Sequence, residues 1–183
     1  SEMCIRDRGG GGDHLALLRC YQQWEESNFS TQWCYENFVQ VRSMKKARDI
    51  REQLTGLCER VEIEAVSSAD IDDIRKAITA GFFFNCARLT RSQEYQTLKH
   101  THTVYIHPSS VLARDQREGV LHSHLVYHEL AFTSKEYMRS ITPIQPQWLL
   151  EVAQHYYDAA SIEDLSHKKK APKVTGKAPE PDR

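Results

Sequence analysis

The sequence predicts an α+β protein in which a helical bundle segment is followed by a small β-barrel flanked by helices. Three observations lead to this prediction. Apolar residues recur at helical spacing from Asp13 to about Ser68. Beyond Leu89 they occur instead in short runs rich in β-branched and aromatic residues. A helical stripe then resumes from Trp148 to Tyr157.

The composition bounds the size and class of the protein. The 183 residues, 40% of them apolar, suffice for one sizeable core or two small ones. Because 24 Lys and Arg face 25 Asp and Glu, any basic surface must come from segregation of the charges. No apolar run approaches the roughly 20 residues that cross a bilayer, and no signal peptide opens the chain. We therefore expect a soluble intracellular protein without membrane contact, whose five cysteines are reduced.

Four segments follow from these patterns. Residues 1–12 end in four glycines and match neither periodicity, so we interpret them as an unstructured linker or an assembly scar. Residues 13–70 are expected to be helical, and residues 71–160 are expected to hold the barrel. Residues 161–183 alternate lysine with proline and have little apolar content, which predicts a disordered basic tail.

The helical segment contains recognisable helix starts. Asp13 is suited to cap the first helix and Ser30 the second, with Phe29 and Cys34 placed as a hydrophobic staple. A later helix, with acidic residues from Asp70 at its start, follows a break. Between these lies an a/d seam suited to packing on another helix, formed by Ala47, Ile50, Leu54, Leu57 and Val61.

Four segments of the barrel region have strand character, namely Tyr95–Leu98, Thr103–His107, Leu125–Phe132 and Tyr137–Ile144. Pro143 and Pro146 are expected to end the last one. Four or five short strands bracketed by helices indicate a closed or partly closed barrel. Aromatic residues on apolar faces are expected in the core, namely Trp33, Tyr35, Phe38, Phe82, Phe83, Phe84 and Trp148.

Motifs of several enzyme classes are absent from the sequence. It contains no GxxxxGK(S/T) loop, no GxGxxG after a strand, no HExxH and no GxSxG. Strands could present His100 with His102, or His122 with His124, to a metal ion, with His107 or His128 as a third ligand. No cysteine lies nearby, so we favour surface imidazoles and predict neither a catalytic nor a metal site.

The stretch from Arg42 to Arg51 carries five cations and one anion on a helix. Arg42, Lys45 and Lys46 share one face with Asp49, which is typical of a surface that binds polyanions. A solvated face, partly neutralised by neighbouring acidic residues, is the alternative.

The barrel region adds cations and hydroxyl groups of the kind that hold single-stranded nucleic acid. Tyr95, Tyr105 and Tyr137 lie on expected strands and could stack on bases. An ordinary barrel with polar turns is the alternative. We expect cations from the helix and the barrel to line one trough for an unpaired polynucleotide.

Six segments, in one uninterrupted order from Gly12 to about Tyr157, resemble the C-terminal region of DEAH-box RNA helicases of pre-mRNA splicing. They are GDHLALLRCYQQWEES, STQWCYENFVQVRSMKKARDIREQL, DIRKAITAGFFFNCARL, YQTLKHTHTVYIHPSSVL, VYHELAFTSKEYMR and WLLEVAQHYY. The resemblance implies a ratchet-like domain over 13–70, an OB-fold over 71–160 and a nuclear location. It also implies that ATP and Mg²⁺ bind to two RecA-like motor domains that this sequence lacks, so this fragment should have no activity alone.

In that family the RNA channel runs between the motor, the ratchet helices and the barrel. The residues here that match it are Arg42, Lys45, Lys46, Arg88, Lys99, His107, Ser109, Thr133, Lys135 and Arg139. The implied partners are single-stranded RNA, a G-patch activator protein, the RecA-like domains and the spliceosome. The resemblance therefore predicts an RNA-binding and regulatory module. The alternative is an adaptor whose barrel binds G-patch partners without itself binding RNA. The sequence departs from the family around residues 113–124, where His122-Ser123-His124 precedes VYHEL.

Overall fold

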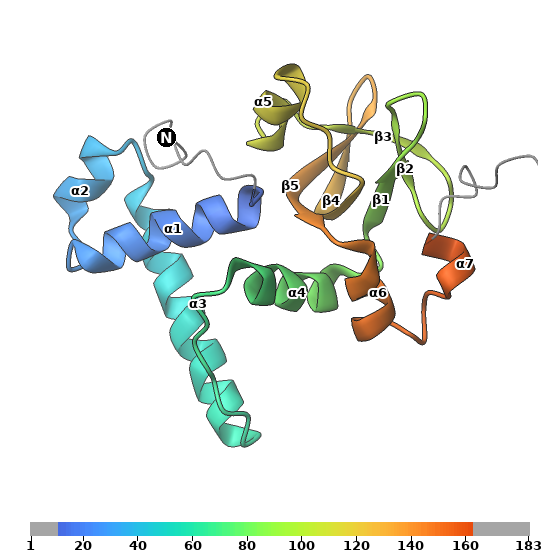
Figure 1. Cartoon of the computed structure of the whole chain (residues 1–183). Coiled ribbons are helices and arrows are strands. Elements are labelled where there is room, and N and C mark those ends of the chain that lie inside the picture. Colours follow the sequence, from blue (N-terminus) through green and yellow to red (C-terminus); the bar gives the residue numbers. More distant parts are fainter. Residues whose placement is uncertain (1–10, 163–183) are drawn as a thin grey trace, which may run out of the picture.

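The computed structural model describes residues 11–162 (Figure 1). The helical segment contains α1 (Asp13–Glu26), α2 (Thr31–Glu36) and α3 (Val41–Arg60), and α4 (Ile71–Phe82) connects it to the barrel. Residues 1–10 of the expected linker and residues 163–183 of the expected tail lie outside the described residues. None of the described helices is long and apolar enough to cross a membrane.

Five strands form a closed barrel in the order β1-β2-β3-β5-β4. They are β1 (Cys86–Leu89), β2 (Tyr95–Thr97), β3 (Thr103–Ile106), β4 (His124–Phe132) and β5 (Glu136–Ile144). The β3–β5 pair is parallel and the other pairs are antiparallel. With α5 (Leu112–Arg117) before β4, and α6 (Pro146–Val152) and α7 (Ala159–Ile162) after β5, this confirms the α+β fold class of helices followed by a small barrel.

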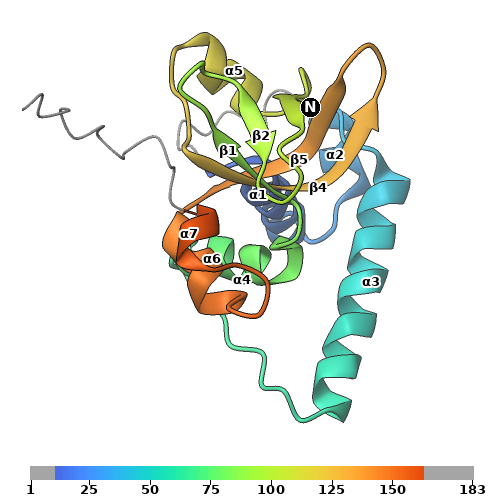
Figure 2. The same cartoon turned by 90° about the vertical axis from the view of Figure 1, so that its right-hand side faces the viewer.

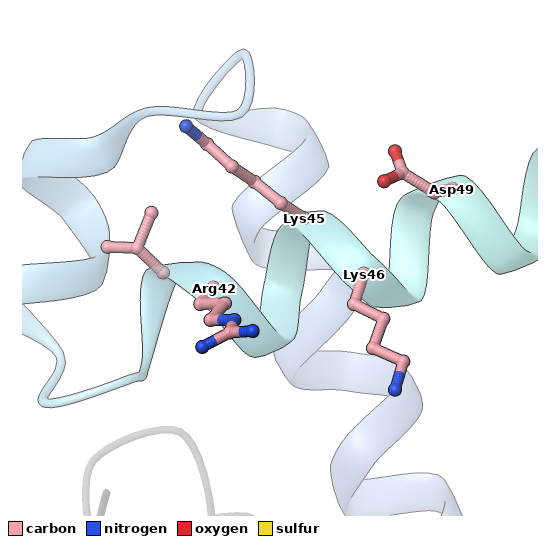
Figure 3. Close-up of a pocket in the computed structure, with 5 residues that line it drawn as sticks. Arg42, Lys45, Lys46 and Asp49 are labelled. Carbon is pink, nitrogen blue, oxygen red and sulfur yellow. The ribbon is translucent and has the colours of Figure 1, made fainter.

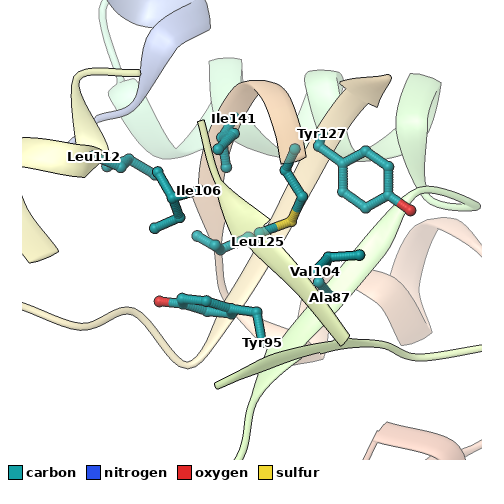
Figure 4. Close-up of a cluster of buried hydrophobic side chains, with 9 residues drawn as sticks. Ala87, Tyr95, Val104, Ile106, Leu112, Leu125, Tyr127 and Ile141 are labelled. Atoms are coloured by element: carbon teal, nitrogen blue, oxygen red, sulfur yellow. The ribbon is translucent and has the colours of Figure 1, made fainter. Parts of the chain in front are cut away.

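The barrel interior is filled by apolar side chains from all five strands and from α5. Figure 4 shows Val104, Ile106, Leu125 and Ile141 converging there. Tyr95 also points inward and is only 2% exposed. Its hydroxyl donates a hydrogen bond to the His122 carbonyl at 2.9 Å, and burial raises its pKa. The prediction that Tyr95 could stack on bases is therefore wrong.

One side of the barrel is covered by α4, α6 and α7. These helices bury the outward side chains of Cys86 on β1 and Val126 on β4 beneath Trp148 and Leu149. The Tyr157 hydroxyl closes this layer by donating a hydrogen bond to the Phe83 carbonyl at 2.7 Å. Burial in this layer raises the pKa of the Cys86 thiol. The helices leave a different part of the barrel surface open.

The three N-terminal helices meet around a small core of Trp24, Cys34 and Met44. The Ser30 side chain accepts a hydrogen bond from the Trp33 N–H, so the predicted cap of α2 is confirmed. The aromatic residues Tyr35, Phe38 and Phe84 are 68%, 79% and 50% exposed, so their assignment to the core is wrong.

The a/d seam of α3 has no helix packed on it in the described part of the chain. Its residues Ile50, Leu54, Leu57 and Val61 are 44%, 55%, 48% and 62% exposed. Figures 1 and 2 show the reason, because α3 projects away from α1 and α2 beyond its first turns. The helix is confirmed, whereas residues 11–162 contain no helix that packs on its seam.

The first residues of α1 attach it to the barrel. Gly12 is the N-cap of α1 at φ 84°, and an added Cβ would lie 2.5 Å from the Ile141 carbonyl oxygen. Asp13 makes no capping hydrogen bond with its own helix. Its Oδ1 accepts hydrogen bonds from the Val111 N–H at 2.8 Å and the Ser110 hydroxyl at 3.0 Å. The predicted cap is therefore wrong, because the carboxylate serves the barrel instead.

Two elements and one strand end differ from the expectation. The strand β1, which contains Arg88, and the helix α5 were not predicted. Pro143 does not end the last strand, because it pairs with Leu125 inside β5. Its carbonyl accepts hydrogen bonds from the Arg75 guanidinium, which attaches α4 to β5.

Candidate nucleic-acid interface

Most of the ten residues predicted to contact RNA fall into two groups in the structure. The first lies on α3 and holds Arg42, Lys45 and Lys46. The second lies on β3, β5 and their connecting turns, and holds His107, Ser109, Thr133, Lys135 and Arg139. The remaining two are Arg88 of β1, which pairs with His124 of β4, and Lys99, whose ammonium donates to the Tyr156 carbonyl.

The α3 group is an exposed cluster of cations. Arg42, Lys45 and Lys46 line a shallow, open hollow together with Val41 and Asp49. Within residues 11–162 none of the three cations has an ion-pair partner. Figure 3 shows Lys45 extending from one side of the helix, and Arg42 and Lys46 from the other.

The other two arginines of the same stretch already have partners within the helical segment. The Arg48 guanidinium lies 5.2 Å from the centre of the Phe29 ring and 3.9 Å from Glu52. The Arg51 Nη1 donates to the Glu25 carboxylate at 2.8 Å. The pKa of Arg51 is raised mainly by its hydrogen bond to Tyr21 and secondly by the one to Glu25. The partly neutralised face that was the alternative to a polyanion-binding surface therefore exists at Arg48 and Arg51, next to the exposed cations.

Lys99 lies far from the α3 group. The Lys99 ammonium lies 4.3 Å from the centre of the Tyr156 ring, between α6 and α7. Figures 1 and 2 both place α7 and α3 on opposite sides of the molecule. The expectation that Lys99 and the α3 cations line one trough within this chain is therefore wrong.

The second group surrounds a pair of tyrosines on the open face of the barrel. Tyr105 of β3 and Tyr137 of β5 are neighbours in the parallel register, with ring centres 6.1 Å apart and planes tilted by 53°. Alternation along β3 buries Val104 and Ile106 in the barrel, so Tyr105 between them points outward. The same alternation buries Met138 and turns Tyr137 outward.

Polar and cationic side chains lie around this tyrosine pair. The Lys135 ammonium lies 4.2 Å from the centre of the Tyr105 ring. On the other side, the His107 ring stands edge-on to Tyr137 at 5.7 Å between ring centres. His107 Nδ1 and the Ser109 hydroxyl are 2.6 Å apart, and the Ser109 N–H donates to the same nitrogen at 3.1 Å. We call Tyr105, Tyr137, Lys135, His107 and Ser109 the tyrosine platform.

Two further predicted residues flank the platform. Arg139 follows Tyr137 on β5, and its Nη1 lies 3.6 Å from the Glu129 carboxylate of β4. Both side chains are about half exposed, so solvent weakens this pair and leaves the guanidinium accessible. The Thr133 N–H donates to the Lys135 carbonyl at 3.1 Å, which holds the turn between β4 and β5.

The arrangement has the components of a single-strand site. Aromatic faces supply stacking surfaces that accept any base, and cations with hydroxyls supply contacts to phosphates. The sequence identified each component separately. What it did not reveal is that parallel pairing of β3 and β5 places Tyr105 beside Tyr137, because a pairing of strands distant in sequence leaves no local pattern.

The histidines do not form a metal site in the described residues. No group of three or more His, Cys, Asp or Glu side chains there could hold a metal ion. His100 and His102 are neighbours with ring centres 5.9 Å apart, whereas His122 lies beside Asp115 and His128 beside Phe82.

Comparison with known families identifies the barrel. Residues 74–156 match the family model of the oligonucleotide/oligosaccharide-binding (OB) fold. The matched residues span most of α4, the whole barrel and α6. The barrel is therefore an OB-fold, as the resemblance implied.

Proposed function

We propose that this chain is the RNA-binding and regulatory C-terminal part of an ATP-dependent DEAH-box RNA helicase that acts in pre-mRNA splicing. In this proposal ATP and Mg²⁺ are bound by RecA-like motor domains outside this sequence, and the chain itself catalyses nothing. Its partners are single-stranded RNA, the motor domains, a G-patch activator protein and the spliceosome, in the nucleus.

The observation that carries the proposal is the tyrosine platform on an OB-fold. The covering helices α4, α6 and α7 pack over Cys86, Val126 and the end of β5 at Ile144, whereas on the other side Tyr105 of β3 and Tyr137 of β5 are only half-buried and remain accessible. On the accessible side, Lys135 and Arg139 supply positive charge, and Ser109 supplies a hydroxyl next to two aromatic rings. These groups suit a single strand whose phosphates are held without readout of the bases.

The α3 cations supply a second contact with the phosphate backbone. Arg42, Lys45 and Lys46 are exposed and lack ion-pair partners among residues 11–162, so they are available to phosphates. These cations lie apart from the tyrosine platform. An RNA strand that contacts both must therefore run along the surface of this chain between them, or cross the motor domains on the way. Binding by charge predicts a steep loss of affinity with salt.

The exposed seam of α3 favours an adaptor role as the second candidate. Ile50, Leu54 and Leu57 form an apolar stripe of a kind that marks contact with another protein. In that case the chain binds G-patch partners, and RNA is held elsewhere. Capture of a G-patch peptide by a chain that fails to bind oligo(U) would favour the adaptor over RNA binding.

Fluorescence anisotropy with labelled oligo(U) tests RNA binding. The affinity should fall with rising salt, with a logarithmic slope of about −0.7 for each phosphate neutralised. Two double variants, Lys45→Glu with Lys46→Glu and Lys135→Glu with Arg139→Glu, should each lose at least about tenfold in affinity at low salt, because each reverses two contacts.

A matched control separates these contacts from overall charge. Arg60→Glu with Arg117→Glu changes the net charge equally at two exposed positions outside both groups. The control should lose no more than about threefold. Salt-independent binding, or an equal loss in the control, would contradict the proposed function.

A further inference from the structure

The outward ring of Tyr105 is covered by a lysine. The Lys135 ammonium lies 4.2 Å from the ring centre, within the range of a cation–π contact. Lys135 comes from the turn between β4 and β5, whereas Tyr105 belongs to β3. The cation therefore occupies a ring face that a nucleotide base would need for stacking.

This cover is held weakly. Lys135 is exposed, and no carboxylate within the described residues forms an ion pair with it. A cation–π contact at an exposed site favours the covered state by only about two- to fivefold. The long lysine side chain can also leave the ring without any change of the backbone, because its four-carbon stem is flexible.

A stacked base is the stronger occupant of the ring. Stacking on an aromatic side chain contributes about five- to 150-fold in affinity per base, which exceeds the preference for the lysine. The Tyr137 ring lies beside Tyr105, with ring centres 6.1 Å apart, and is itself in contact with the His107 ring. Tyr105 is therefore supported by an aromatic neighbour on β5. Displacement of Lys135 then exposes Tyr105 at the edge of the platform.

We propose that Tyr105 is a base-stacking residue, and that Lys135 leaves its ring to bind the phosphate of the stacked nucleotide. This inference rests on the proposed RNA-binding function and assigns the roles of two residues within it. The exchange replaces a cation–π contact with a base stack and an ion pair to phosphate. It is tolerant of sequence, because every base offers a π face.

The salt dependence of oligo(U) binding by the whole chain distinguishes the two roles of Lys135. Lys135→Gln should reduce the magnitude of the logarithmic salt slope by about 0.7, because one phosphate contact is lost. Extrapolated to 1 M salt, where ionic contacts contribute little, the variant should bind about two- to fivefold more tightly than the unaltered chain, because no cover has to be displaced. An unchanged slope, or no gain at 1 M salt, would overturn the exchange.

A second variant tests the stacking itself. Tyr105→Leu keeps an apolar side chain on β3 and removes the aromatic face. Combined with Lys135→Gln, it should weaken binding at 1 M salt by about fivefold or more relative to Lys135→Gln alone. Made alone, it should cost less, because the unaltered chain must first displace the lysine from the ring. Arg117→Gln on α5 is the charge-matched control and should change neither slope nor intercept. Circular dichroism melting identifies any variant that fails to fold.

These experiments distinguish RNA binding by the chain from base stacking on Tyr105. If the unaltered chain fails to bind oligo(U), the proposed function and this inference both fail. If it binds with the expected salt slope while Tyr105→Leu combined with Lys135→Gln binds as well as Lys135→Gln alone, only the stacking role is wrong.

Discussion

The Asp13 carboxylate accepts a hydrogen bond from the Ile141 N–H at 2.7 Å, although 128 residues separate them in the sequence. Its other oxygen accepts from the Val111 N–H. One side chain at the start of α1 thus satisfies backbone donors of β5 and of the segment before α5. This contact joins the helical segment to the OB-fold.

We predict that Asp13→Asn destabilises the chain by about 1–3 kcal/mol, because the amide nitrogen must face a backbone N–H that previously had an acceptor. Urea unfolding measures the change in the free energy of unfolding. Glu26→Gln, which removes the same charge at an exposed position of α1, should change it by less than about 0.5 kcal/mol. Equal effects of the two substitutions would contradict the role of Asp13.

Substitution of Gly12 tests the close approach of α1 to β5. In Gly12→Ala the new Cβ would lie 2.5 Å from the Ile141 oxygen and 2.7 Å from the Thr142 Cα, at a φ of 84° that disfavours alanine. We expect a clear drop in melting temperature. Gly56→Ala in α3 has open space around the new methyl group, so it should stabilise the helix by about 0.5–1 kcal/mol. A harmless Gly12→Ala would show that the two elements are not in contact.

Stability should depend on pH through His14. Its Nδ1 lies 2.7 Å from the Thr142 hydroxyl, and its ring lies against Phe82. Burial lowers the pKa of His14 below its ordinary value of 6.5, Asp13 opposes this shift, and His128 adds to it. The unfolded chain therefore binds the proton more readily, so stability is retained above about pH 6.5 and lost as the pH falls below it.

Thermal melts between pH 8 and pH 5 measure this dependence. His14→Gln should flatten part of the fall in melting temperature, because the titrating group is gone while a polar partner for Thr142 remains. His100→Gln, at an exposed position, should leave the profile as it is in the unaltered chain. A profile that His14→Gln leaves unchanged would refute the assignment.

The exposed seam of α3 gives a further prediction. Leu54→Gln should change the free energy of unfolding by less than about 0.5 kcal/mol, because Leu54 is 55% exposed. Met44→Ala should cost about 2–5 kcal/mol, because Met44 fills the small core with Trp24 and Cys34. Urea unfolding compares the two. A loss of 2 kcal/mol or more in Leu54→Gln would show that the seam is packed in solution.

Local signals were predictable from the sequence. The predicted cap at Ser30 is confirmed, because a cap bonds to an N–H two or three residues away. At the acidic helix start expected from Asp70 onward, the Asp70 side chain likewise accepts from the Asp72 N–H. Asp13 has the same residue type before a helix, yet its partners lie far along the chain. No pattern near Asp13 distinguishes the two cases.

Elements without a strong periodic signal were missed. The strand Cys86–Leu89 has four residues, and none of them is β-branched or aromatic. The helix Leu112–Arg117 is short and mostly polar. The tyrosine platform depends on the β3–β5 pairing, so its members were named from the sequence while their meeting was not.

The most direct test of the account is an NMR titration of the isotopically labelled chain with oligo(U). The account predicts that the amide signals of residues 103–109 and 133–139 shift, together with those around Lys45 and Lys46. Signals of the covered side, around Phe83 and Tyr157, should stay in place. Shifts confined to the covered side, or none at all, would contradict RNA binding at the tyrosine platform.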